Sequence, residues 1–178
     1  SDARAAPIIA QAGPGAWAHA TIASMAPSPD VASAPPAALR RRSGDRALAM
    51  LRAASPRHAA LLENPGLGER VRQVALASDF AVETLRRQPA VLEPLAAADP
   101  VPLSAPVLDP GLPDSWPTRL RLYRAAASTR LVWRDVLGLD TVEDTLAGST
   151  RLAEDCLRIA LAAVEAEFAE RHGTVRDE

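Results

Sequence analysis

The sequence contains no lysine, so all 20 of its basic residues are arginine. Mechanisms that need a Schiff-base lysine or a phosphate-gripping lysine are therefore excluded. Aromatic residues make up only 3% of the 178 residues, and with few β-branched residues beside them this composition disfavours a large β-sheet. No apolar run approaches the roughly 20 residues that span a bilayer, and no secretory signal pattern occurs. We therefore expect a soluble, cytoplasmic protein without a membrane segment.

Cysteine and histidine are also too sparse to indicate a site. Cys156 is the single cysteine, so no internal disulfide can form, and its apolar helical surroundings predict a buried structural thiol. The histidines His19, His58 and His172 lie far apart and lack metal-ligand spacing. We interpret His58 as a surface or capping residue. Phosphate-loop, HExxH, CxxC and GxSxG motifs are missing, so the residues alone predict no catalytic, cofactor-binding or metal-binding residue.

What the sequence does contain favours an all-α fold. Alanine is abundant, 48% of the residues are hydrophobic and 24% are charged, a composition typical of closely packed helices. The formal net charge of −2 creates no global field that attracts nucleic acid, which disfavours nucleic-acid binding. We predict an irregular helical bundle that ends in a long antiparallel helix pair.

Proline and helical periodicity divide the chain into four parts. Residues 1–36 are rich in alanine, proline, glycine and serine and are interpreted as a partly ordered arm. Residues 37–98 form short helices separated by proline-capped turns, and 99–116 form a stiff proline-rich connection. Residues 117–172 form a long helical hairpin.

The predicted hairpin begins with an arginine-rich helix from Arg119 to Asp135. We expect Asp114 or Ser115 to cap its start and Gly138 to end it. Its apolar face places Trp133 on the buried side.

The second predicted helix of the hairpin runs from Val142 to about Arg171. Asp140 or Thr141 should cap it, with an acidic residue at the third position closing a capping box. Gly148 and Ser149 predict a kink or an early break. The expected apolar positions are Leu146, Leu152, Cys156, Ile159, Ala163, Ala166 and Phe168.

Four arginines of the first hairpin helix are candidate interface residues: Arg119, Arg124, Arg130 and Arg134. One interpretation is that Arg130 and Arg134, four residues apart, pair with acidic side chains of the second helix. Glu143, Asp144 and Asp155 are the candidates for this pairing. The other interpretation is that the guanidinium groups face a carboxylate or phosphate outside this chain.

Several segments together resemble a known enzyme family. They are Ser78–Phe80, Leu85–Pro89, Leu120–Arg124 and Arg130–Gly138, the last with the pattern Arg-x-x-Trp-Arg-Asp-x-x-Gly. In this order they resemble the N-terminal helical region of the bifunctional glutamine synthetase adenylyltransferase/adenylyl-removing enzymes. The sequence departs from the family at 125–127, where three alanines replace arginines and a glutamate.

The resemblance implies a function for a parent protein and none for this chain alone. It implies a nucleotidyltransferase domain after residue 178, ATP and magnesium as cofactors of that domain, and glutamine synthetase and the PII signalling protein as partners. The parent enzyme would control nitrogen assimilation, and this chain would be inactive by itself. The alternative is a stand-alone, non-enzymatic helical module that binds a partner protein through its arginine face.

Overall fold

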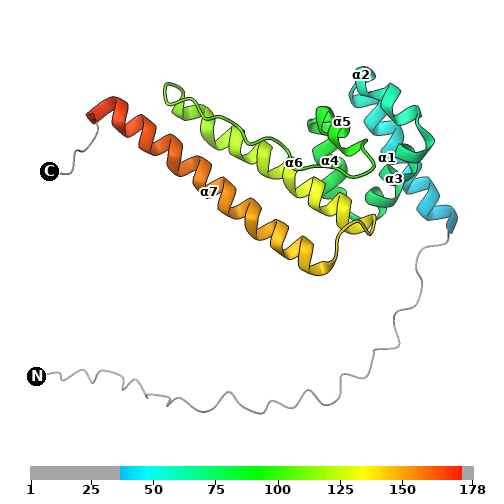
Figure 1. Ribbon diagram of the computed structural model, residues 1–178. Helices are drawn as coiled ribbons and strands as arrows, with labels where there is room; N and C mark the ends of the chain where they lie inside the picture. Colours follow the sequence, from blue (N-terminus) through cyan, green and yellow to red (C-terminus); the bar gives the residue numbers. More distant parts are fainter. Residues whose placement is uncertain (1–36, 174–178) are drawn as a thin grey trace, which may run out of the picture. The chain divides into compact units, whose positions relative to one another are not determined.

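The computed structural model describes residues 37–173, and every regular element within that range is a helix. The all-α class and the antiparallel pair at the end are therefore confirmed (Figure 1). The predicted N-terminal arm, residues 1–36, lies outside the described residues.

The first part of the described chain is a set of short helices whose starts are set by proline and capping residues. Pro56, Pro65 and Pro89 each stand in the first turn of a helix, where the missing N–H leaves no hydrogen bond unmade. The Asn64 and Ser78 side chains accept hydrogen bonds from the free amides of the helices that follow them. The elements are α1 (Ala37–Ala54), α2 (Pro56–Ala59), η1 (Ala60–Glu63), α3 (Pro65–Ala77), α4 (Asp79–Arg87), η2 (Pro89–Val91) and α5 (Leu92–Leu95).

The second part consists of two long helices side by side, preceded by a stretch without regular structure and by η3 (Pro113–Ser115) (Figure 1). Helix α6 covers Trp116–Val136 and α7 covers Val142–His172. Gly138 ends α6 with φ +67°, and the amides of Gly138 and Leu139 donate to the carbonyls of Asp135 and Arg134, which is a Schellman motif. Because only five residues separate the helices, α7 must run back along α6.

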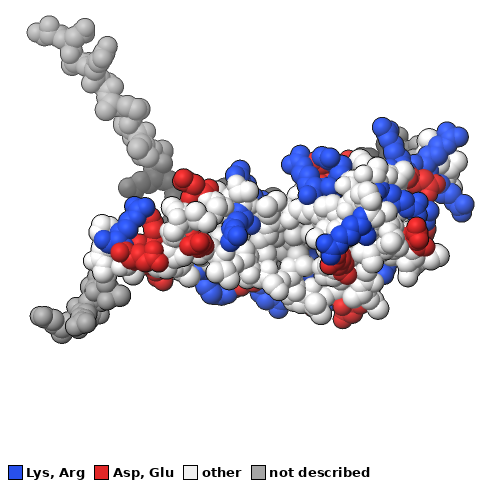
Figure 2. Space-filling view, turned by 90° about the horizontal axis from the view of Figure 1, so that it is seen from above, with Lys and Arg blue, Asp and Glu red and all other residues white. Residues whose placement is uncertain are grey.

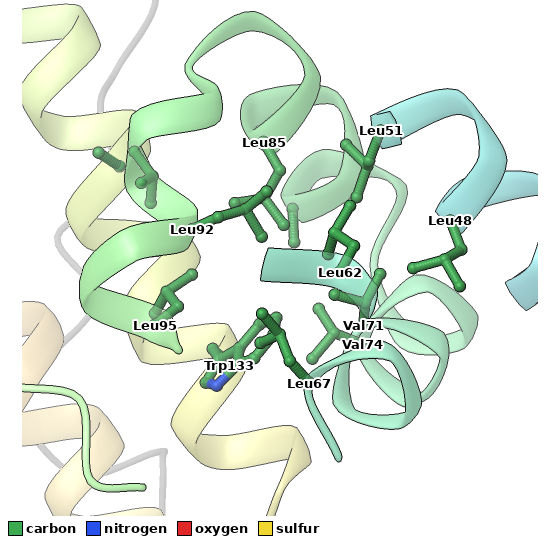
Figure 3. Close-up of a cluster of buried hydrophobic side chains, with 13 residues drawn as sticks. Leu48, Leu51, Leu62, Leu67, Val71, Val74, Leu85, Leu92, Leu95 and Trp133 are labelled. Carbon is green, nitrogen blue, oxygen red and sulfur yellow. The ribbon is translucent and has the colours of Figure 1, made fainter. Parts of the chain in front are cut away.

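An apolar core joins α6 to the short helices. Trp133 of α6 is fully buried, and Figure 3 shows its indole reaching toward Leu67 of α3 and Leu95 of α5. The Arg70 guanidinium carbon lies 5.9 Å from the centre of the indole ring, within cation–π range. The buried members of this core are Leu48, Leu51, Leu62, Leu67, Val71, Val74, Ala81, Leu85, Val91, Leu92, Leu95, Ala126 and Trp133.

Two sequence predictions about helix ends are wrong. Neither Asp114 nor Ser115 caps α6, because η3 runs directly into it and the Ser115 hydroxyl donates to the Leu112 carbonyl instead. The predicted break at Gly148 does not occur either, since α7 is continuous. Gly148 serves packing: a Cβ there would lie 2.6 Å from a methyl group of Leu131, so glycine lets α7 approach α6 closely.

The interpretation of His58 as a surface residue is also wrong, since it is buried. Its Nδ1 lies 2.7 Å from the Ser55 hydroxyl and its Nε2 lies 3.1 Å from a carboxylate oxygen of Glu93. The histidine therefore connects the start of α2 to α5, and both ring nitrogens have a partner, as burial of a polar group requires.

Candidate functional site

The four candidate arginines do not act as one set on α6. Arg119, Arg130 and Arg134 lie on one side of the helix. They are 11 and 4 residues apart, and at about 100° per residue these spacings turn the side-chain direction by only about 20° and 40°. Arg124 is rotated away from each of them by about 80–140° at the same angle per residue. The fold therefore presents a row of three arginines and one separate arginine.

Arg134 is the most strongly held member of this row. Its guanidinium bonds Asp140 at 2.7 Å, bonds Asp99, and donates to the Pro100 carbonyl at 3.1 Å. The hydrogen bonds that Arg134 donates to Asp140 and, second, to Asp99 raise the pKa of Arg134 above its ordinary value. The side chains of Arg134 and Asp140 are only 14% and 11% exposed, whereas that of Asp99 is 79% exposed, so Asp140 is the partner that depends most on this contact.

The other two arginines of the row bind the proline-rich segment that connects α5 to η3. Arg130 donates through Nε to the Pro100 carbonyl at 2.9 Å, and Arg119 donates to the Val107 carbonyl at 2.6 Å. The Trp116 indole N–H adds a 2.7 Å bond to the Asp109 carbonyl. The segment from residue 99 to 109 consequently lies along α6 in the opposite direction (Figure 1).

These contacts correct the first interpretation of the arginines. The acidic partners of Arg134 are Asp99, at the start of the connection, and Asp140, in the turn after α6. Within the described residues, Glu143, Asp144 and Asp155 of α7 make no ion pair with Arg130 or Arg134. The row braces α6 against the proline-rich segment rather than against α7. Arg124 is exposed and lines a shallow depression between α6 and α7.

A pocket of about 300 Å³ lies between α6, α7 and the connecting segment. Pro102 and Leu103 close one side, and Arg130, Arg134 and Tyr123 line the α6 side. Burial raises the pKa of Tyr123, and burial together with the neighbouring Arg134 lowers the pKa of Arg130. The pocket is lined by polar and apolar side chains alike.

The α7 wall of this pocket carries side chains of both charges. Asp144, Arg151 and Asp155 line it, beside Gly148 and Leu152. Asp144 is already used in the capping box, where its carboxylate accepts from the Thr141 amide at 3.1 Å, and Asp155 accepts from Arg158 at 2.6 Å. The carboxylates of the pocket are therefore committed to structure.

The described residues contain neither an activated thiol nor a metal-binding cluster. Cys156 is partly buried, and burial raises the pKa of its thiol, so that the reactive thiolate is disfavoured. Residues 37–173 hold no group of three or more histidine, cysteine or acidic side chains that could bind a metal ion. In the same range no helix combines the length and the apolarity that crossing a membrane requires.

Figure 2 adds the distribution of charge on one face of the molecule. Basic side chains are most numerous at the right-hand end of that view, and the middle of the face is largely uncharged. The surface feature that sequence reasoning missed is a row of exposed, large apolar side chains along α7. The signal for it was available, because apolar residues recur on two faces of that helix.

Comparison with known proteins gives consistent matches. The chain is 66% identical over 103 residues to a bifunctional glutamine synthetase adenylyltransferase/adenylyl-removing enzyme of Xanthomonas oryzae. This alignment covers 58% of the present chain and 11% of the relative. It is 59% identical over 131 residues to the protein of the same name from Xanthomonas campestris, covering 74% of this chain and 14% of the relative. It is also 60% identical over 106 residues to the protein of the same name from Stenotrophomonas maltophilia, and this alignment covers 60% of the present chain and 11% of the relative.

No family model matches the chain, and no solved structure matches it. The chain spans about 11–14% of the length of these curated relatives. The resemblance that the arginine-tryptophan pattern indicated is confirmed: this chain is related in sequence to a segment of the bifunctional glutamine synthetase adenylyltransferase/adenylyl-removing enzymes.

Proposed function

We propose that this chain is the N-terminal helical portion of an enzyme that adenylylates and de-adenylylates glutamine synthetase to control nitrogen assimilation, and that it is inactive by itself. The observation that carries the proposal is the identity of 59–66% to three relatives of that name. Over more than a hundred aligned residues, identity of this order supports descent from a common protein segment.

The proposal assigns the chemistry to a part of the polypeptide outside this sequence. Nucleotidyl transfer needs carboxylates that hold metal ions over the nucleotide phosphates. The sequence contains no Asp-x-Asp pair, and the carboxylates of the α6–α7 pocket are engaged in a cap and an ion pair. In this proposal ATP and magnesium bind to the remainder of the enzyme, and glutamine synthetase and the PII signalling protein are its partners. The cytoplasmic location stays a prediction.

Two experiments test the proposal. The first is to sequence the reading frame downstream of Glu178, where we expect a strand, a Gly-Ser turn and an Asp-x-Asp pair. The second is to assay the purified chain with glutamine synthetase, ATP, magnesium and phosphate, where we expect neither adenylylation nor its removal. Turnover by the chain free of full-length enzyme would overturn its inactivity.

A chimera tests the parent function directly. In it, this chain replaces the matching segment of the Xanthomonas oryzae relative, and the relative lacking that segment is the control. We expect the chimera to retain both activities of the relative. A folded chimera without either activity would contradict the assignment.

The alternative, a stand-alone helical interaction module, is favoured by one observation, the exposed apolar face of α7. A stop codon directly after Glu178 would support this alternative.

A further inference from the structure

Helix α7 has an apolar face that nothing in the described part of the chain covers. Six large side chains on this helix are between 50% and 73% exposed. We call this set the outer stripe: Val142, Leu146, Leu157, Leu161, Val164 and Phe168.

The outer stripe is a true helical face. At about 100° per residue, its six members fall within an arc of about 100°, and they extend over about 40 Å of helix at 1.5 Å per residue. The contacts with α6 lie on the opposite side of α7, where Gly148 meets Leu131 and Ala163 is buried. Thr150 and Ala153 occupy this face between Leu146 and Leu157, so the large side chains are densest from Leu157 to Phe168. Scattered single apolar side chains are normal on a protein surface, but a group of four along one face marks an interaction site.

An acidic row borders the outer stripe on one side. Glu143, Glu154 and Glu165 follow one another at intervals of 11 residues, which is close to three helical turns, so they line up along α7. All three are exposed. Within residues 37–173 none of them forms a hydrogen bond or an ion pair. The other border has the small residues Ser149 and Ala160 and, near the end of the helix, Glu167, whose carboxylate is paired with Arg171 at 2.7 Å.

This charge pattern favours one kind of binding partner for the stripe over another. If two copies of α7 packed against each other in antiparallel fashion, like borders would meet, and the acidic rows would face and repel each other. A helix with arginine or lysine beside its apolar face would instead pair with the row while its apolar side chains covered the stripe.

We propose that the outer stripe of α7 is a docking face for an amphipathic helix with a basic border, supplied by the remainder of the longer polypeptide to which this chain belongs. The inference rests on the proposed function for the source of that helix. Because the chain spans only 11–14% of the relatives' length, most of such a polypeptide is available to supply it. The row of glutamates sets the register of docking, and the stripe supplies the buried area.

The test compares side-chain reactivity in the isolated chain and in the chimera described above. Hydroxyl-radical footprinting reports Leu157, Leu161 and Phe168, and carbodiimide labelling reports Glu154 and Glu165. We expect all of them to react several-fold more slowly in the chimera than in the isolated chain. Equal reactivity in both proteins would overturn the proposal. Protection in the isolated chain that rises with its concentration would also overturn it, because a second copy would then be the occupant.

Matched controls separate docking from general effects. Phe80 of α4 and Leu112 before η3 are also about half exposed or more and lie off the stripe, so their reactivity should stay the same in both proteins. Replacing Leu157 and Leu161 together by glutamate should leave the helicity and melting midpoint of the isolated chain unchanged, since both are exposed, and should restore the reactivity of Phe168 in the chimera. Unchanged protection in that variant would refute the role of the stripe.

The readout is independent of enzyme activity, so the two proposals fail separately. A chimera that is active but whose stripe is fully reactive refutes docking and leaves the proposed function intact. A folded chimera that is inactive but whose stripe is protected refutes the function and supports docking.

Discussion

Replacing Arg134 by alanine should destabilise the protein by about 2–4 kcal/mol. The estimate comes from the two carboxylates that the guanidinium contacts. Asp140 is slightly more buried than Arg134, and removing one member of a buried pair costs about 3–5 kcal/mol because the other charge is left without a partner. Asp99 is largely exposed, and a contact of that kind contributes about 0–1 kcal/mol. Because Arg134 and Asp140 are still slightly exposed to water, we expect a total cost somewhat below the value for a fully buried pair.

Urea unfolding followed by circular dichroism measures this cost. A double-mutant cycle of Arg134→Ala with Asp140→Ala isolates the pair, and we expect the double variant to lose clearly less than the sum of the two single losses. Arg134→Lys should be only a partial rescue, since an ammonium cannot present the planar fork that reaches Asp140, Asp99 and the Pro100 carbonyl together. If Arg134→Ala has the midpoint and slope of the wild type, the bracing role of Arg134 is refuted.

Further changes test the core, the cap and the pH dependence, each by its unfolding midpoint. Trp133→Ala should cost about 3–5 kcal/mol through lost burial and a cavity, and an unchanged midpoint would mean that the indole is not packed. Thr129→Val should be neutral or stabilising by up to about 1 kcal/mol, because the buried Thr129 hydroxyl has no hydrogen-bond partner within residues 37–173; a loss would imply a partner. Thr141→Ala should cost about 1 kcal/mol by removing the cap of α7, and no loss would show that the capping box is not formed. Hydrogen bonds from Arg86 and then Arg87 lower the pKa of Glu83 from 4.5 to about 2, so its contribution is present above pH 4.5 and is lost as the pH falls to 2. Glu83→Gln should therefore flatten the pH dependence of the midpoint in that range, and an unaltered profile would contradict the lowered pKa.

Local rules allowed much of the fold to be predicted from the sequence. Ser78 and Thr141 cap the helices that follow them, and Gly138 takes the left-handed conformation that ends α6. These features depend on residues within one turn of each other, so spacing alone reveals them. Trp133 was assigned to the buried side from periodicity, and it is fully buried.

Predictions that depended on distant contacts were less successful. Arg134 pairs with Asp99, 35 residues earlier in the chain, and His58 is buried because Glu93, also 35 residues away, meets its Nε2. A sequence pattern indicates that an arginine or histidine needs a partner, but the fold decides which carboxylate or carbonyl comes within reach. For this reason the arginine row was assigned to α7 when it belongs to the connecting segment.

The contacts of the arginine row also bear on where a second domain can bind. Arg119, Arg130 and Arg134 are occupied by carbonyls and carboxylates of this chain, so they could meet another domain only by giving up those bonds. Helix α7 has the opposite property. It is apolar on two sides, and α6 covers only one of them. The glutamate row beside the uncovered side is likewise without a partner among the described residues. The surface for a partner domain is therefore expected on α7, on the side away from the arginines.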